Sequence, residues 1–92
     1  MKQRVVERVQ TGVRVEKRVL LVLKAMAGAH DLSLGDLLEG IVLHAFEGKA
    51  PFAGASLERI AVLKQAFGLD LTAADSHLLV EAPGKATRKS RR

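Results

Sequence analysis

The sequence contains no cysteine, tryptophan or tyrosine, and only two prolines and three phenylalanines among its 92 residues. Without cysteine the chain can form no disulfide, zinc ribbon or thiol nucleophile, so burial of apolar side chains must hold it together. A chain this short buries only about 60–65% of its unfolded surface, so its core is marginal in a monomer. We therefore expect the chain to oligomerise, and the lack of cysteine fits a cytoplasmic protein.

Long apolar runs are also lacking. The longest run, Val19 to Leu23, stops at Lys24 and resumes only as 25–29, far short of the roughly 20 residues that a membrane span needs. Read as a signal peptide, the amino-terminal region would carry two glutamates before a core of five apolar residues, which fits the pattern poorly. We expect no membrane partner and no secretion.

Charge is distributed unevenly along the chain. Residues 1–24 hold seven basic and two acidic side chains, residues 25–84 hold three and eight, and residues 85–92 hold five and none. The net charge of +5 thus conceals two strongly positive ends. Such a distribution is typical of polyanion binding, although basic ends are also common on small proteins that bind no nucleic acid.

The first regular pattern is an alternation of side chains over residues 10–15. Apolar or β-branched residues occupy the odd positions, and Gln10, Gly12 and Arg14 occupy the even ones. This period of two predicts a β-strand, within which Gly12 marks a bulge or a close approach of backbones. Residues 1–9 precede the strand as a basic arm.

Two helices are predicted to follow the strand directly. Apolar residues recur at helical spacing from Lys17 to Ala29, which predicts the first helix. Ser33 then stands where it can cap a second helix that runs to about Glu47, with Asp36 three residues further on. Gly48 is placed to end this helix in a left-handed conformation.

The carboxyl-terminal half predicts two more helices. Ser56 can cap a third helix that ends at Phe67, before Gly68. Thr72 and Asp75 form a capping box for a short fourth helix, which would stop before residues 83–84. Residues 85–92 hold no large apolar side chain, so we expect them to be disordered.

A single strand cannot form a sheet, so its partner is expected to be a second copy of the chain. An antiparallel ribbon between the two copies would point the odd-numbered side chains inward and the even-numbered ones outward. A two-stranded ribbon fits the major groove of DNA, where arginine bonds guanine and glutamine bonds adenine. The predicted dimer core comprises Val13, Val15, Leu20, Leu23, Leu38, Ile41 and Val42.

The stretch VRVEKRVLLVLKAMAGAHDLSLGDLLEGIVLHAF, from Val13 to Phe46, resembles the ribbon-helix-helix DNA-binding fold of the Arc/MetJ/CopG superfamily. This resemblance implies an α+β, mostly helical dimer with an intermolecular antiparallel two-stranded sheet. A carboxyl-terminal helical extension would be added to it. The family's base-contacting residues fall on Gln10, Gly12 and Arg14. Its phosphate-binding helix end falls on Leu32, Ser33 and Leu34, and the basic side chains expected to contact phosphate are Lys2, Arg4, Arg8, Lys17 and Arg18.

The sequence departs from the family pattern in three ways. Gly12 has no side chain with which to contact a base, and Asp31 places a carboxylate near the expected phosphate site. The third departure is a second apolar face, which we expect the third and fourth helices to cover. This face comprises Leu21, Val22, Leu43 and Phe46.

Other chemistries find little support in the sequence. His30, His44 and His77 show no spacing typical of metal ligands. Asp75 and Ser76 adjoin His77 and so cannot converge on one helix as a hydrolytic triad. We predict no enzyme activity, no metal and no cofactor.

The sequence therefore predicts four segments. They are a basic arm (1–9), a ribbon-helix-helix DNA-binding and dimerisation domain (10–48), a helical extension (49–84) and a basic tail (85–92). The predicted protein is a homodimeric, sequence-specific transcriptional repressor of the cytoplasm, associated with the nucleoid and able to assemble further on double-stranded DNA. One alternative is an antitoxin whose residues 49–84 neutralise a partner enzyme. Another is a helical interaction module that binds no nucleic acid.

Overall fold

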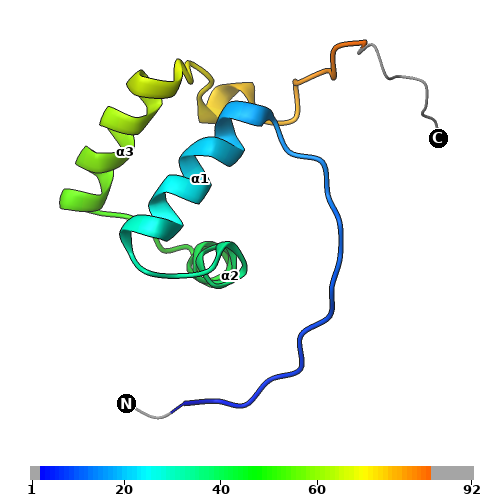
Figure 1. Cartoon of the computed structure of the whole chain (residues 1–92), viewed down its shortest axis with the longest axis vertical. Helices are drawn as coiled ribbons and strands as arrows, with labels where there is room; N and C mark the ends of the chain where they lie inside the picture. Colours follow the sequence, from blue (N-terminus) through cyan, green and yellow to red (C-terminus); the bar gives the residue numbers. More distant parts are fainter. Residues whose placement is uncertain (1–2, 84–92) are drawn as a thin grey trace.

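The computed structural model describes residues 3–83, whose regular structure is entirely helical (Figure 1). Three α-helices, α1 (Lys17–Ala29), α2 (Leu34–Phe46) and α3 (Ala55–Phe67), are followed by a single 3-10 turn, η1 (Ala73–Asp75). The helix predicted from Lys17 to Ala29 is confirmed at both ends. The second helix is confirmed to within one residue at its carboxyl end.

Local capping contacts explain where α1 and α2 begin and where α2 ends. The Glu16 carboxylate accepts a hydrogen bond from the backbone N–H of Val19 at 2.9 Å and so caps α1. Ser33 caps α2 as predicted, because its Oγ accepts a hydrogen bond from the N–H of Asp36 at 3.1 Å. Just beyond α2, Gly48 adopts the expected left-handed conformation, with φ of 72°.

The third helix starts two residues earlier than a cap at Ser56 would allow. Its cap is Gly54, whose φ of 54° and ψ of −125° suit a residue without a β-carbon, and no side chain caps the helix. Gly68 ends α3, as predicted, and it does so in the left-handed conformation.

The predicted fourth helix is reduced to η1. The capping box between Thr72 and Asp75 is present, but Ser76 leaves helical geometry at ψ of 138°, and His77 has φ of 67°. The capping prediction was correct, and the predicted helix through residues 78–80 was wrong.

The helix α1 lies between the other two and packs against both (Figure 1). Only four side chains of the described chain are buried hydrophobics: Val22, Met26 and Ala27 of α1, and Leu37 of α2. Around them lie half-buried apolar residues, Leu23, Ile41, Phe52, Ile60, Leu63 and Leu69. The core is therefore small and centred on α1.

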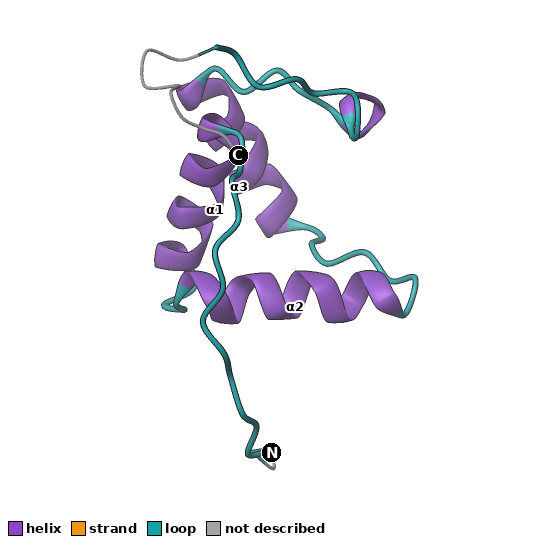
Figure 2. Ribbon diagram, turned by 90° about the vertical axis from the view of Figure 1, so that its right-hand side faces the viewer, coloured by secondary structure: helices purple, strands orange, loops and turns teal. Residues whose placement is uncertain are grey.

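The predicted ribbon is absent from residues 3–83, which contain no strand and no sheet (Figure 2). Residues 10–15 form an exposed coil, and no backbone hydrogen bond joins them to another segment of the described chain. Alternating side chains make a strand only where backbone donors and acceptors find partners. Nothing in residues 3–83 supplies them. The α+β class and the ribbon-helix-helix sheet were thus wrong predictions, and the fold is mostly helical.

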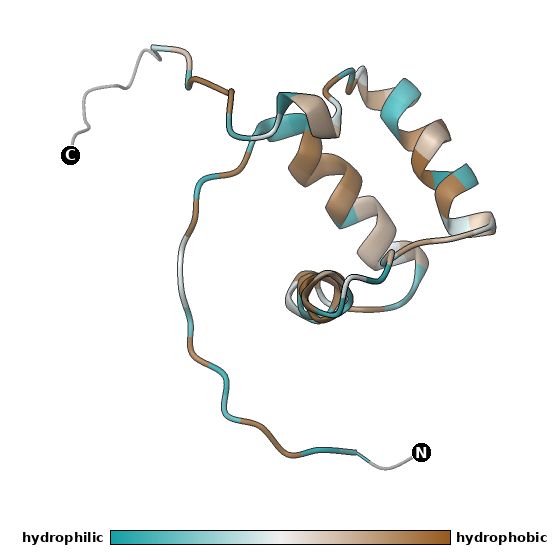
Figure 3. Cartoon of the chain, turned by 180° about the vertical axis from the view of Figure 1, so that it is seen from behind, coloured by the Kyte–Doolittle hydropathy of each residue, from teal (hydrophilic) through white to brown (hydrophobic). Residues whose placement is uncertain are grey.

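The predicted cover over the second apolar face forms only in part. Val22 is buried, whereas Leu21 is at the margin of exposure and Leu43 and Phe46 are 61% and 80% exposed. The cause is that α3 packs against α1 and not against α2, while the fourth helix does not form. Figure 3 accordingly shows α2, seen end-on, coloured mostly as hydrophobic.

Candidate nucleic-acid interface

Residues 3–16, called the N-terminal segment below, form an extended coil that curves past the outer side of α2 (Figures 1 and 2). The segment carries Arg4, Arg8 and Arg14, and its residues 3–15 are all exposed. Within residues 3–83, the backbone of residues 3–15 makes no hydrogen bond to another segment, and only the Glu16 oxygen does so, accepting from the N–H of Leu20 at 3.0 Å where α1 begins. What ties this segment to the helices is therefore its side chains.

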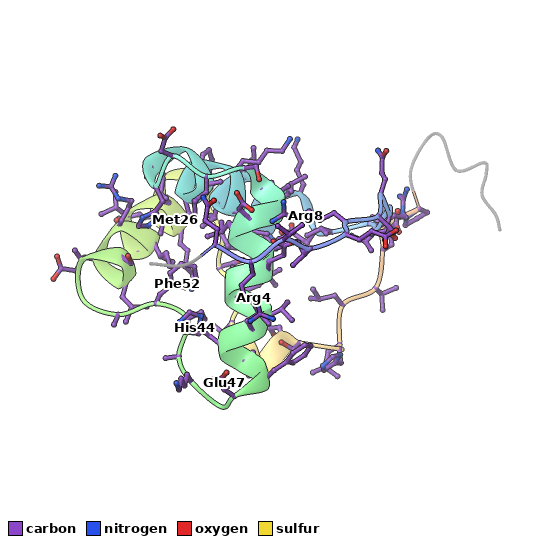
Figure 4. All side chains as sticks on the ribbon, turned by 90° about the horizontal axis from the view of Figure 1, so that it is seen from below. Arg4, Arg8, Met26, His44, Glu47 and Phe52 are labelled. Carbon is purple, nitrogen blue, oxygen red and sulfur yellow. The ribbon has the colours of Figure 1, made fainter. Side chains whose placement is uncertain are left out.

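Arg8 connects the segment to the start of α2 (Figure 4). Its Nη2 donates to Oδ1 of Asp36 at 2.9 Å and to Oε1 of Glu39 at 2.7 Å, while its Nε donates to Oε2 of Glu39 at 2.8 Å. The hydrogen bond with Glu39 raises the pKa of Arg8 and lowers that of Glu39. All three side chains remain substantially exposed.

Arg14 is held by a carboxylate from the far end of the described chain. Its Nε donates to Oε1 of Glu81 at 3.1 Å, and its Nη2 donates to Oε2 of the same residue, so the pair is bidentate. The hydrogen bonds raise the pKa of Arg14 and lower that of Glu81. Residues 13–18 and 79–82 line a common open groove, together with Leu71.

The side chain of Arg18 is less exposed than those of Arg8 and Arg14. Its Nη1 donates to the backbone oxygen of Gly68 at 2.8 Å and to Oδ1 of Asp70 at 3.2 Å, and its Nε donates to Glu16 at 2.9 Å. These bonds join the start of α1 to the end of α3, where a cation also complements the helix dipole. Arg18 therefore stabilises the junction between α1 and α3.

The other residues predicted to contact DNA are separated in the structure. Gln10, Gly12 and Lys17 are exposed, Arg4 makes no ion pair with any described residue, and Lys2 lies outside residues 3–83. The contacts of these residues with DNA stay predictions.

The predicted phosphate site at the start of α2 is placed among acidic side chains. Ser33 uses its hydroxyl to cap the helix, the N–H of Leu32 donates to the oxygen of Ala27 at 2.9 Å, and Leu34 is half-buried. Asp36 and Glu39 flank this helix end, and Arg8 is bonded to both. The structure thus brings Arg8 close to the predicted site, whereas Arg14 is bonded to residue 81.

The residues predicted as a dimer core divide into two groups. Leu20, Leu23 and Ile41 are half-buried within the single chain. The remainder are exposed, namely Val13, Val15, Leu38 and Val42.

The carboxylates that bind Arg8 and Arg14 were not predicted from the sequence. Asp36, Glu39 and Glu81 lie 28, 31 and 67 residues from their partners, separations at which no local spacing rule applies. The one available signal was the acidic middle of the chain, which suggests intrachain pairing with the basic start but does not say which residues meet.

Residues 3–83 lack both a metal-ligating cluster and a membrane-spanning helix. No three side chains of the types that ligate metals gather at one place, and none of the helices there combines the length and apolar character that crossing a bilayer demands. No family model, curated protein or solved structure matches the chain.

Proposed function

We propose that this chain binds double-stranded DNA as a homodimeric transcriptional repressor of the cytoplasm, with its N-terminal segment as the principal contact. The observation that carries the proposal is the placement of Arg4, Arg8 and Arg14 on an extended, exposed segment. Guanidinium groups bind phosphate and guanine edges in a planar, two-pronged geometry. The basic excess of residues 1–24 supports the same function.

An extended segment can enter a groove of DNA without forming a sheet, as basic arms of DNA-binding domains do. On this proposal Gln10 and Arg14 contact bases, and Gly12 lets the backbone approach the duplex closely. Arg4 and Lys17 contact phosphates. These roles differ in their consequence, because base contacts give specificity and phosphate contacts give affinity that depends on salt.

The proposed dimer uses the outer face of α2. Leu38, Val42, Leu43 and Phe46 are exposed there at 37%, 41%, 61% and 80%, and large exposed apolar patches mark interaction surfaces. A second copy would cover this face symmetrically, and a symmetric dimer would present two N-terminal segments to one duplex.

The proposal is tested by measuring affinity for a selected duplex and for random duplexes by fluorescence anisotropy. Arg14→Ala should cost about 1–3 kcal/mol on the selected site alone, as loss of a bidentate base contact does. Arg4→Ala should weaken binding to all sequences and lower the slope of log K against log salt by about 0.9, as loss of one phosphate contact does.

Arg59→Ala is the matched control, since it removes the same charge from the exposed surface of α3. It should change affinity less than either variant of the segment. A wild-type chain that binds no duplex at low salt, or a selection that enriches no site, contradicts the proposal.

A second function, neutralisation of a partner enzyme as an antitoxin, is favoured by one observation. Leu78, Leu79 and Val80 are 73%, 52% and 91% exposed, on a segment that forms no helix. Such a segment can order itself on a partner. A chain that binds DNA yet stays monomeric would assign the exposed face of α2 to a foreign protein and raise this function above the first.

A further inference from the structure

We infer that the N-terminal segment is autoinhibited, with Glu81, Asp36 and Glu39 occupying the guanidinium edges that would otherwise bind DNA. The inference rests on the proposed function and adds a regulatory element to it. Three carboxylates in this chain would then compete with a duplex for these two arginines.

The two arginines use the same part of their side chains in these ion pairs. Glu81 accepts from Nε and Nη2 of Arg14, and the carboxylates around Arg8 likewise accept from its Nε and Nη2. A phosphate group, or the O6 and N7 atoms of guanine, also needs two neighbouring N–H groups of one guanidinium. Carboxylate and DNA therefore compete for the same donors.

Both pairs are open to exchange with an incoming polyanion. The side chains of Arg14 and Glu81 are 82% and 64% exposed, and that of Arg8 is 60% exposed. An exposed ion pair contributes little free energy, so each pair tunes the affinity and does not prevent binding. The carboxylate also repels phosphate when it stays near the duplex.

The pair with Glu81 links the N-terminal segment to the carboxyl-terminal part of the described chain. Residues 79–82 face residues 13–18 across the groove that they line together. Residues 79–82 themselves form a coil. Any event that moves residues 79–82 therefore frees Arg14. This arrangement gives the chain a way to couple that segment to its affinity for DNA.

The experiment compares Glu81→Gln with Glu58→Gln on one fixed duplex, by anisotropy at constant low salt. Both variants remove one exposed carboxylate, so their long-range effect on the net charge is the same. Glu58 lies in the first turn of α3 and forms no ion pair with any described residue. Glu81→Gln should tighten binding by about 1.5- to 5-fold relative to Glu58→Gln, the range that an exposed ion pair allows.

The same comparison in an Arg14→Ala background isolates the pair, as a double-mutant cycle does. There the extra gain from Glu81→Gln should vanish. Asp36→Asn combined with Glu39→Gln should give a separate gain that vanishes in an Arg8→Ala background.

The outcomes separate the two proposals. If the wild-type chain binds no duplex, the proposed function fails and the inference fails with it. If the wild-type chain binds but Glu81→Gln matches Glu58→Gln, the function stands and the inference is overturned. An extra gain that persists without Arg14 also overturns it, because general repulsion of phosphate then explains the effect.

Discussion

At the scale of the residue, one side chain lies at the centre of the core. Met26 is 1% exposed and is the only side chain in the described core below 2%. Its three rotatable bonds let it fill the irregular space between helices. Around it the core is narrow, so single polar contacts at helix ends, such as the cap made by Glu16, weigh more in this molecule than they would in a larger one.

We expect the cap at Glu16 to make stability depend on pH. The hydrogen bond from the N–H of Val19 and the pairing with Arg18 lower the pKa of this carboxyl below its usual value. Its contribution is therefore complete above the ordinary pKa of glutamate and is lost as the pH falls through the lowered pKa. The difference in Tm between the wild type and Glu16→Gln should shrink as the pH falls from about 5, above the ordinary pKa of glutamate, through the lowered pKa.

Thermal melts followed by circular dichroism measure this difference, with Glu58→Gln as the control for loss of one carboxylate. A difference in Tm that stays constant over this range of pH would show that Glu16 acts by packing and not by its charge.

At the scale of the element, the three α-helices could be predicted from the sequence, whereas the predictions of the ribbon and of a fourth helix were wrong. Ser33, Gly48 and Gly68 act on residues within one turn of themselves, so a short stretch of sequence is enough to predict their effects. The alternation over residues 10–15 describes side chains only, and a strand also requires a second strand to pair with its backbone. The ion pairs of the candidate interface join distant residues, and for that reason no local pattern revealed them.

Alanine substitutions at Gly68 and at Gly40 should change the free energy of unfolding in opposite directions. Gly68 has φ of 68°, where a β-carbon costs about 1–2 kcal/mol, so Gly68→Ala should lower the free energy of unfolding by about that amount. Gly40 lies inside α2, and a β-carbon there meets nothing within 4 Å, so Gly40→Ala should raise it by about 0.5–1 kcal/mol. Urea denaturation at a fixed protein concentration measures both. Equal signs would contradict the backbone assignment.

At the scale of the whole molecule, the helices α2 and α3 each depend on α1. The packed helix pairs in residues 3–83 are α1 with α2 and α1 with α3. This arrangement leaves the outer face of α2 exposed, and it leaves the apolar side chains of the N-terminal segment exposed as well. A chain of this design gains stability from any partner that covers α2.

We expect self-association through α2 to be visible by sedimentation velocity over a range of protein concentrations. Leu43→Glu and Phe46→Glu should weaken the dimer at least about tenfold, because each places a carboxylate in an apolar interface. Both side chains are exposed in the single chain, so its helical content should be kept. Val62→Glu, at a residue of α3 that is 65% exposed, is the control. A wild-type chain that sediments as a monomer at all concentrations contradicts the dimer.

The unpaired backbone of the N-terminal segment also bears on how long the protein stays intact. Proteases bind their substrates as extended chains whose backbone groups are available, and residues 3–15 offer such a chain, with Arg8 and Arg14 as sites for trypsin-like enzymes. A cut after Arg14 would separate the segment from intact helices. The folded remainder would keep its core and lose the arginines proposed to contact DNA, so one cleavage would end the proposed DNA binding while leaving most of the molecule in place.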